Sequence, residues 1–341
     1  MVNIDMTTSE SEDHKRQDYY ALTPDTVLNA LTAYGYQTDA RILALNSYEN
    51  RVYQVGLDDK EPVVAKFYRP ERWPDEAILE EHAFTQSLCD HEIPVVPPLQ
   101  HDAEQTLLNY QGYRFAVYPR RGGHAPEPGN LDELGWLGRL IGRIHAVGEV
   151  KNFNHRPTLD VNSYAREPVR LLTEKNFIPA DLLSSFETIT SELIKELDKL
   201  FENNSTVKYI RSHSDCHVGN ILWVRDQGPH FVDFDDCRSC PAIQDLWMLL
   251  AGNRQEQNLQ LSELLDGYSQ FFEFNPRELR LIEPLRTLRM IHYAGWLAKR
   301  WTDPAFPANF PWFNTYSYWA QFIEELKQQM ELIHSEPLQW F

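Results

Sequence analysis

The most informative part of this 341-residue sequence is one polar stretch, Ser212-His213-Ser214-Asp215-Cys216-His217-Val218-Gly219-Asn220. Apolar Ile221-Leu222-Trp223 follows it, then the turn-like Asp226-Gln227-Gly228, then Phe231-Val232-Asp233. Two short apolar runs around a turn predict a β-hairpin. Because a hairpin can bring its flanking loops side by side, Asp215, Asn220 and Asp233 are expected to meet.

These three residue types together indicate metal-assisted phosphoryl transfer. A carboxylate and an amide oxygen, here Asp233 and Asn220, suit Mg²⁺, a hard cation that keeps waters and phosphates in its shell. Asp215 is then left to accept a proton from a hydroxyl nucleophile. Positioning, a metal and one base are what this reaction needs.

The region upstream of this stretch has β character. Alternating and β-branched residues predict strands at Arg41–Leu45, Arg51–Gly56, Pro62–Tyr68, Thr106–Asn109 and Tyr113–Tyr118. The first three form an antiparallel meander because only short turns separate them. Pro74-Asp75-Glu76 opens a helix between the third and fourth strands.

A change in composition at Pro119–Gly129 marks the expected domain boundary. Beyond it the apolar periodicity is mostly helical, including one pattern over about 243–252. We therefore expect an α+β fold in three parts: a flexible extension over 1–20, a β-rich N-terminal lobe over 21–119, and a C-terminal lobe over 120–341; the resemblance described below implies nucleotide binding by the first lobe and catalysis and acceptor binding by the second. The N-terminal lobe is an antiparallel sheet with one crossing helix, and the larger C-terminal lobe is mainly helical. Loops between two such lobes would carry the site in a cleft.

The composition excludes several classes of protein. Net charge is −18, which argues against nucleic-acid binding because such proteins present a basic face. No apolar run is long enough to span a membrane, and no secretory signal is recognisable, so a soluble, cytoplasmic protein is expected. The isolated pair Cys237 and Cys240 offers only two of the four ligands that zinc needs, so ordinary reduced thiols are the favoured interpretation.

The pattern His213-x-Asp215-x-x-x-x-Asn220, followed by Val232-Asp233, resembles the aminoglycoside phosphotransferase/choline kinase-like enzymes, which have the protein-kinase-like fold. The similarity is closer to bacterial stress response kinases of the RdoA type. It extends over about residues 20–335 and includes Leu45–Gln54, Lys66–Trp73, Gln244–Leu250 and Asp303–Pro307. The resemblance implies a bilobal, monomeric, cytoplasmic Ser/Thr protein kinase that uses ATP and Mg²⁺ and acts on a protein substrate in a stress response.

The resemblance also implies roles in catalysis and metal binding. Asp215 resembles the catalytic base, and Asn220 and Asp233 resemble the two Mg²⁺ ligands, with Asp233 counted among the catalytic residues. Asp245 resembles a buried aspartate that braces the catalytic loop.

Nucleotide binding is implied for residues of the N-terminal lobe. Lys66 resembles the lysine that holds the α/β-phosphates, and Glu81 resembles its ion-pair partner, with the adjacent Glu80 as the alternative. Ser47 lies in the turn that covers the phosphates in the family, and Tyr113–Tyr118 resembles the hinge that meets the adenine.

The chain departs from the family at two places. The phosphate-covering turn lacks G-x-G-x-x-G, so Ser47 and backbone N–H groups must act there. Ser214 stands where glycine is commoner, although serine tolerates a positive φ less well.

Other interpretations stay open. A small-molecule hydroxyl kinase on the same fold would use the same catalytic residues, whereas a metallo-hydrolase or a pseudokinase is disfavoured. His213, His217, Asp235 and Asp236 are interpreted as structural, second-sphere or solvated. An aromatic cluster of Trp296, Trp301, Phe306, Phe310, Trp312 and Phe313 is interpreted as core, or else as part of an acceptor groove with Arg286, Arg289, Lys299 and Arg300.

Overall fold

A computed structural model describes residues 22–225 and 227–341 of the chain. They form two compact units. The first runs to His124 and also takes in Leu222–Asp235, and the second comprises Ala125–Ile221 and Asp236–Phe341. The expected extension over 1–20 and Asp226 of the expected hairpin turn lie outside the described residues, and the expected lobe boundary stays a prediction. Among the described helices, none has the length and apolar character needed to cross a membrane.

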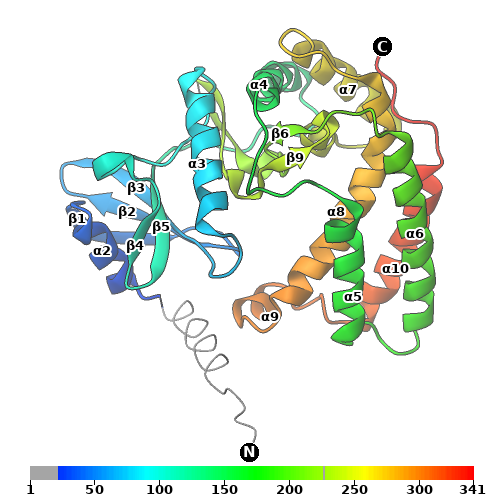
Figure 1. Cartoon of the computed structure of the whole chain (residues 1–341), viewed down its shortest axis with the longest axis horizontal. Helices are drawn as coiled ribbons and strands as arrows, with labels where there is room; N and C mark the ends of the chain where they lie inside the picture. Colours follow the sequence, from blue (N-terminus) through cyan, green and yellow to red (C-terminus); the bar gives the residue numbers. More distant parts are fainter. Residues whose placement is uncertain (1–21, 226) are drawn as a thin grey trace, which may run out of the picture. The chain divides into compact units, whose positions relative to one another are not determined.

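The first unit is built on a five-stranded antiparallel sheet in the order β1-β2-β3-β5-β4 (Figure 1). Its strands are β1 (Thr38–Ala44), β2 (Arg51–Leu57), β3 (Lys60–Phe67), β4 (Leu108–Tyr110) and β5 (Tyr113–Pro119). The helices are α2 (Pro24–Ala33) and α3 (Asp75–Asp90). The predicted meander and its helix are confirmed.

Alternation along β3 separates the two faces of this sheet, because successive side chains point to opposite sides. Ala65 and Phe67 belong to the main core, where α2 packs and Phe67 stacks on Phe115 with ring centroids 4.9 Å apart. Tyr68 belongs to a smaller cluster with Ile78 of α3. Lys66 therefore points to the face that α3 covers.

The hairpin predicted from Ile221 to Val232 is present as β7 (Ile221–Val224) and β8 (Gly228–Phe231). Bridges Val95↔Phe231 and His124↔Trp223 attach it to the first unit. Asp233 and Asp235 follow β8 directly, so this attachment delivers both carboxylates to the first unit.

The second unit is mainly helical. Its helices are α4 (Leu131–Glu149), α5 (Glu167–Glu174), α6 (Leu183–Asn203), α7 (Arg254–Tyr268), α8 (Ile282–Lys299), α9 (Ala305–Asn309) and α10 (Tyr316–Ile333). A small antiparallel pair, β6 (Ile210–Ser212) and β9 (Arg238–Cys240), lies among them. Close approach of α4 and α7 requires Gly138, since a Cβ there would lie 2.0 Å from the Leu264 carbonyl oxygen.

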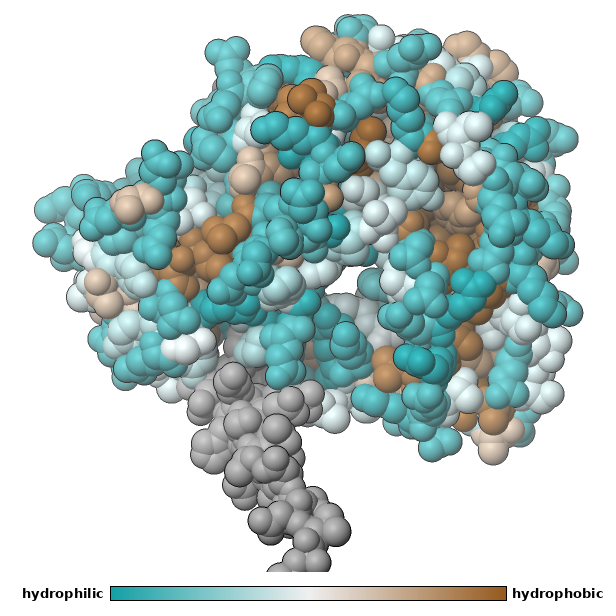
Figure 2. Space-filling model, viewed as in Figure 1, coloured by the Kyte–Doolittle hydropathy of each residue, from teal (hydrophilic) through white to brown (hydrophobic). Residues whose placement is uncertain are grey.

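One helix expectation is wrong. The segment over about 243–252 forms two short 3₁₀ turns, Ala242–Asp245 and Trp247–Leu249, instead of a helix. The apolar pattern there reflects burial of residues 243–247 and Leu249, and periodicity alone does not distinguish a short buried run from a helix. The face of the molecule in Figure 2 is largely hydrophilic, interrupted by small hydrophobic patches.

Candidate active site

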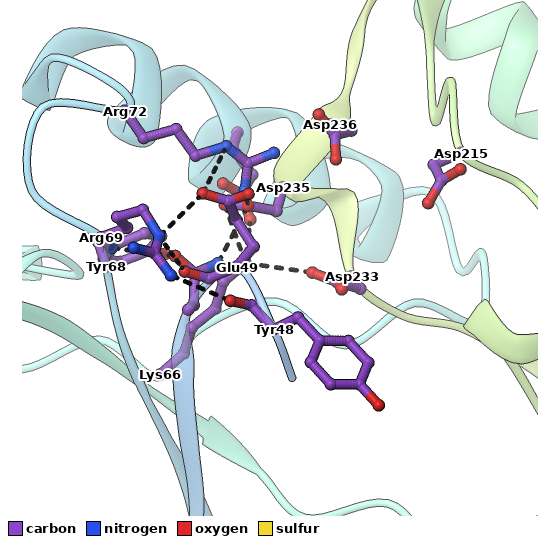
Figure 3. Close-up of polar contacts among 12 residues, drawn as sticks. Tyr48, Glu49, Lys66, Tyr68, Arg69, Arg72, Asp215, Asp233, Asp235 and Asp236 are labelled. Atoms are coloured by element: carbon purple, nitrogen blue, oxygen red, sulfur yellow. Dashed lines mark hydrogen bonds and ion pairs between the residues drawn. The ribbon is translucent and has the colours of Figure 1, made fainter. Parts of the chain in front are cut away.

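Lys66 is the centre of a buried charge cluster in the first unit (Figure 3). It is 6 % exposed, and its Nζ lies 3.2 Å from Asp233, 3.2 Å from Asp235 and 3.5 Å from Glu81. Burial by itself lowers the pKa of Lys66, but the three carboxylates, Asp235 foremost, raise it well above its ordinary value. The ammonium therefore stays charged inside the protein.

The structure brings Glu81 to Lys66. Adjacent residues of a helix point about 100° apart, so one alone can face the sheet. Glu81 is 3 % exposed on α3 and contacts Lys66, whereas Glu80 is half-buried. Tyr68 completes this side, with the Lys66 Nζ 5.2 Å from its ring centroid.

Asp235 is a site residue that the sequence interpretation placed in a secondary or solvated position. It is 3 % exposed, and its carboxylate contacts Lys66, pairs with Arg72 and accepts a hydrogen bond of 3.0 Å from Asn50 Nδ2. Two features of the sequence point to Asp235. The stretch Lys66–Trp73 contains both cations that it contacts, Lys66 and Arg72, and Asp235 is a second acidic residue two positions after Asp233.

The turn between β1 and β2 is held by side chains instead of glycines. Arg69 donates to the carbonyl oxygens of Glu49 at 2.9 Å and Tyr48 at 3.1 Å, and its own N–H donates to Asn50 Oδ1 at 3.1 Å. Ser47 lies in this turn and is partly buried. These bonds explain how the turn keeps one shape without G-x-G-x-x-G.

Asp215 and Asn220 are in contact in the second unit. The loop leaves β6 after Ser212 and ends in a 3₁₀ turn, Val218–Asn220. Asn220 Nδ2 donates to the Asp215 carbonyl oxygen at 2.9 Å and lies 3.4 Å from its carboxylate. Both contacts use the amide nitrogen of Asn220.

Asp245 fixes the same loop by hydrogen bonds to its backbone. Its carboxylate accepts the backbone N–H of His213 at 2.8 Å and of Ser214 at 2.6 Å, and lies 3.0 Å from His145 Nε2. Ser214 has φ 69°, and Gln244 Nε2 donates to its carbonyl oxygen. The left-handed backbone is therefore kept at a serine because two hydrogen bonds, one to its N–H and one to its carbonyl oxygen, fix both of its peptide groups.

Asp215 is paired with Arg289 of α8, which the sequence suggests only for the alternative acceptor groove. Arg289 donates to one oxygen of the Asp215 carboxylate, and His217 Nε2 lies 3.5 Å from the other oxygen. Burial raises the pKa of Asp215, but His217 and Arg289 outweigh burial and hold the pKa well below its usual range. Asp215 is therefore ionised and able to accept a proton.

The donor set fits a hard divalent cation. Asp233 has φ 60° and its side chain is 56 % exposed despite the contact with Lys66, so carboxylate oxygen remains accessible. Carboxylate and amide oxygens are ligand types that Mg²⁺ takes, with water and phosphate to complete the shell. Over residues 22–225 and 227–341, no group of three or more His, Cys, Asp or Glu is arranged to hold a metal without such help. Cys237 and Cys240 are buried thiols that are not joined in a disulfide.

Comparison with known proteins places these residues in context. Residues 41–282 match the phosphotransferase enzyme family known as APH. Stress response kinase A of Escherichia coli K12 is 46 % identical over 321 residues, covering 94 % of this chain and 96 % of that protein. Serine/threonine protein kinase RdoA of Salmonella typhimurium LT2 is 42 % identical over the same shares.

Solved structures show the same fold. An amicoumacin kinase in complex with AMP-PNP, Ca²⁺ and amicoumacin superposes with a TM-score of 0.70 at 20 % identity, covering 93 % of this chain and 96 % of that one. A microcompartment-associated aminopropanol kinase gives 0.71 at 16 % identity, with coverage of 91 % and 98 %. The α+β, kinase-like fold expected from the sequence is confirmed.

Proposed function

Since this chain belongs to the phosphotransferase enzyme family, we propose that it is an ATP- and Mg²⁺-dependent kinase of serine or threonine hydroxyls in proteins, acting in a bacterial stress response. The kinase assignment follows from the family. The protein acceptor and the stress response are supported by the names of relatives at 42–46 % identity. A monomeric, cytoplasmic enzyme is part of the same proposal and rests on the resemblance.

The observation that carries the proposal is the burial of Lys66 among Glu81, Asp233 and Asp235. A buried ammonium is costly unless it is paired, and these carboxylates keep it charged and fixed in direction. Such an ammonium suits the α/β-phosphates of ATP as a compact point charge. Ser47 and the backbone N–H groups of the turn that Arg69 holds would contact the phosphates.

The second group of residues would handle the acceptor hydroxyl. Asp215 accepts the hydroxyl proton as the oxygen bonds to the γ-phosphorus, and ADP leaves with the electrons of the broken P–O bond. Asn220 and Asp233 would hold Mg²⁺, which when bound neutralises phosphate charge. We propose that these residues and the Lys66 cluster serve one reaction.

Transfer of ³²P from [γ-³²P]ATP tests the proposal. Purified protein is offered generic protein acceptors and a panel of hydroxyl-bearing metabolites, with Asp215→Ala as the inactive variant and exposed Asp181→Ala as its control. Removing a general base costs about 10²–10⁴-fold in rate, so Asp215→Ala should lose at least about 100-fold in kcat while ATP affinity by calorimetry is kept.

Two results would contradict the proposal. More than a tenth of wild-type turnover in Asp215→Ala would show that this carboxylate is not the base. Phosphorylation of metabolites with no transfer to protein would replace the protein kinase with the small-molecule kinase, whose fold the amicoumacin and aminopropanol kinases share.

A further inference from the structure

Helix α8, labelled in Figure 1, is largely buried but carries one row of partly exposed side chains. Arg289, Tyr293, Trp296 and Arg300 follow one another at intervals of three or four residues, which places them in one row. All four are at least partly exposed, whereas Leu288 and Ile291 beside them are fully buried. Tyr293 stacks on Trp296 with centroids 5.7 Å apart, and the Arg300 guanidinium lies 5.2 Å from the Trp296 ring centroid. The row is therefore aromatic and cationic.

Arg289 joins this row to the proposed catalytic base. Its guanidinium pairs with Asp215, yet the side chain remains 39 % exposed. A guanidinium carries five donors in a planar fork, more than one carboxylate oxygen can use. Any hydroxyl that approaches the Asp215 carboxylate therefore comes within reach of a solvent-accessible arginine.

Cationic side chains gather around His292 on α8, although the whole chain carries −18, and the Asp215 and Asp236 carboxylates are each paired with one of these arginines. His292, on the same helix, stacks on Tyr164 with ring centroids 4.3 Å apart. The guanidinium carbon of Arg238 lies 4.9 Å from the Tyr164 ring centroid. Burial lowers the pKa of His292 to about 3, and the charges of Arg238, Arg300 and Arg289 act in the same direction. Asp236 opposes them, but it is itself paired with Arg238 at 3.0 Å.

We propose that Arg289 selects the acceptor, and that the hydroxyl to be phosphorylated is flanked by an anionic group, a carboxylate or a phosphate. This inference rests on the proposed kinase function. The guanidinium would exchange the Asp215 carboxylate for the anion of the acceptor, because paired donors match both groups. That exchange also frees Asp215 for the hydroxyl proton.

Charge then determines specificity by repulsion as well as by attraction. An amino alcohol or a basic peptide would place its cation next to Arg289 and be repelled by it. The cation would also gain little from Asp215, because Arg289 already pairs with that carboxylate. Acidic polypeptides and small hydroxy acids share the favoured chemistry, and the experiment distinguishes them.

The test uses three peptides that are identical except for the residue beside the single serine, which is Asp, Asn or Lys. Asp and Asn have the same shape and differ in charge. Glycerate and ethanolamine serve as the small anionic and cationic acceptors. For each acceptor, kcat and KM are measured at saturating Mg²⁺–ATP with the wild type, Arg289→Gln, Arg289→Lys and the control Arg166→Gln. Arg166 is a matched control because it also pairs with an aspartate, Asp198, at similar exposure, 44 % against 39 %.

We expect the wild type to favour the Asp peptide over the Asn peptide by at least about tenfold in kcat/KM, which corresponds to about 1.4 kcal/mol. The preference should arise mainly in KM. Arg289→Gln should reduce it to less than about threefold, Arg289→Lys should keep part of it because a point charge attracts without the fork, and Arg166→Gln should keep all of it.

Each contrary result has one meaning. Equal use of the Asp, Asn and Lys peptides by the wild type would overturn the inference while leaving the protein kinase intact. An equal loss for every acceptor in Arg289→Gln would also overturn it, because Arg289 would then act only on the loop. Transfer to glycerate alone would support an anionic acceptor but refute a protein acceptor, and transfer to nothing would overturn both proposals.

Discussion

Replacing Asp235 by asparagine tests whether the buried carboxylate that contacts Lys66 is part of the site. The substitution preserves shape, and the amide oxygen that it introduces can still accept the hydrogen bond from Asn50 Nδ2, which is 3.0 Å long in the wild type. The change therefore removes the charge facing Lys66 and Arg72, and it turns the new NH₂ group toward the Lys66 ammonium. The side chains of Asp235, Lys66 and Arg72 are 5 %, 8 % and 11 % exposed, so solvent screens the charges weakly.

The expected loss of stability follows from what the two cations retain. Breaking a buried pair by removing one partner costs about 3–5 kcal/mol. Here Lys66 keeps Glu81 at 3.5 Å and Arg72 keeps Glu49 at 3.6 Å, so the lower end applies. We expect Asp235→Asn to reduce the free energy of unfolding of the first unit by about 3 kcal/mol. The melting temperature should fall by about 6–12 °C.

Activity provides the second measurement. With position 235 neutral, Lys66 is drawn more strongly to Asp233, 3.2 Å away, and competes with the metal for that carboxylate. Half-maximal activity should therefore require more Mg²⁺. Asp58→Asn is the control, because it removes one charge from the exposed turn between β2 and β3. Urea unfolding that shows a loss below about 1 kcal/mol, together with an unchanged Mg²⁺ requirement, would refute this account of Asp235.

Three further substitutions test other parts of the site. Lys66→Arg should fold but lose at least about 30-fold in kcat/KM for ATP, because the planar guanidinium displaces a carboxylate or the phosphates; near wild-type kinetics would remove Lys66 from the site. Asp245→Asn should lower kcat by at least about 100-fold with ATP affinity kept, because an amide has one oxygen for two backbone donors and presents an NH₂ to the other; unchanged turnover would disprove the brace. Burial raises the pKa of Glu278 from 4.5 to about 7, so the folded chain binds this proton more tightly than the unfolded chain. Wild-type stability should therefore fall as pH rises from about 4.5 to 7, and Glu278→Gln, measured by urea unfolding at pH 5 and pH 8, should gain about 3 kcal/mol over the wild type across that range. A constant difference would contradict the assignment.

Much of the first unit could be predicted from local sequence. The β-branched runs around short turns determine the meander, and alternation along β3 separates Lys66 from the Ala65 and Phe67 of the core. The choice of Glu81 over Glu80 could not be made in this way, because both are acidic residues on one helix. It depends on the rotation of α3 about its axis, which the packing of Ile78 against the sheet fixes.

In the segment after Gln244, an apolar pattern that arises from burial predicts a helix that is not formed. Asp245 directs its carboxylate at two backbone N–H groups of the loop that carries Asp215. The chain achieves this with two 3₁₀ turns. A local pattern cannot reveal a shape that is imposed by a loop 30 residues away.

Asp233 and Asp235 show the same limit within one motif. Both carboxylates approach Lys66 to 3.2 Å, yet one side chain is 56 % exposed and the other 5 %. Between them the backbone changes from the left-handed conformation of Asp233, φ 60°, to the 3₁₀ turn at Phe234–Asp236. An accessible carboxylate is free to share a metal with phosphate, whereas a buried one is committed to Lys66 and Arg72. Sequence identifies two acidic residues at this position, and the backbone turn between them separates an exposed carboxylate, proposed to bind metal, from a buried one that contacts Lys66 and Arg72.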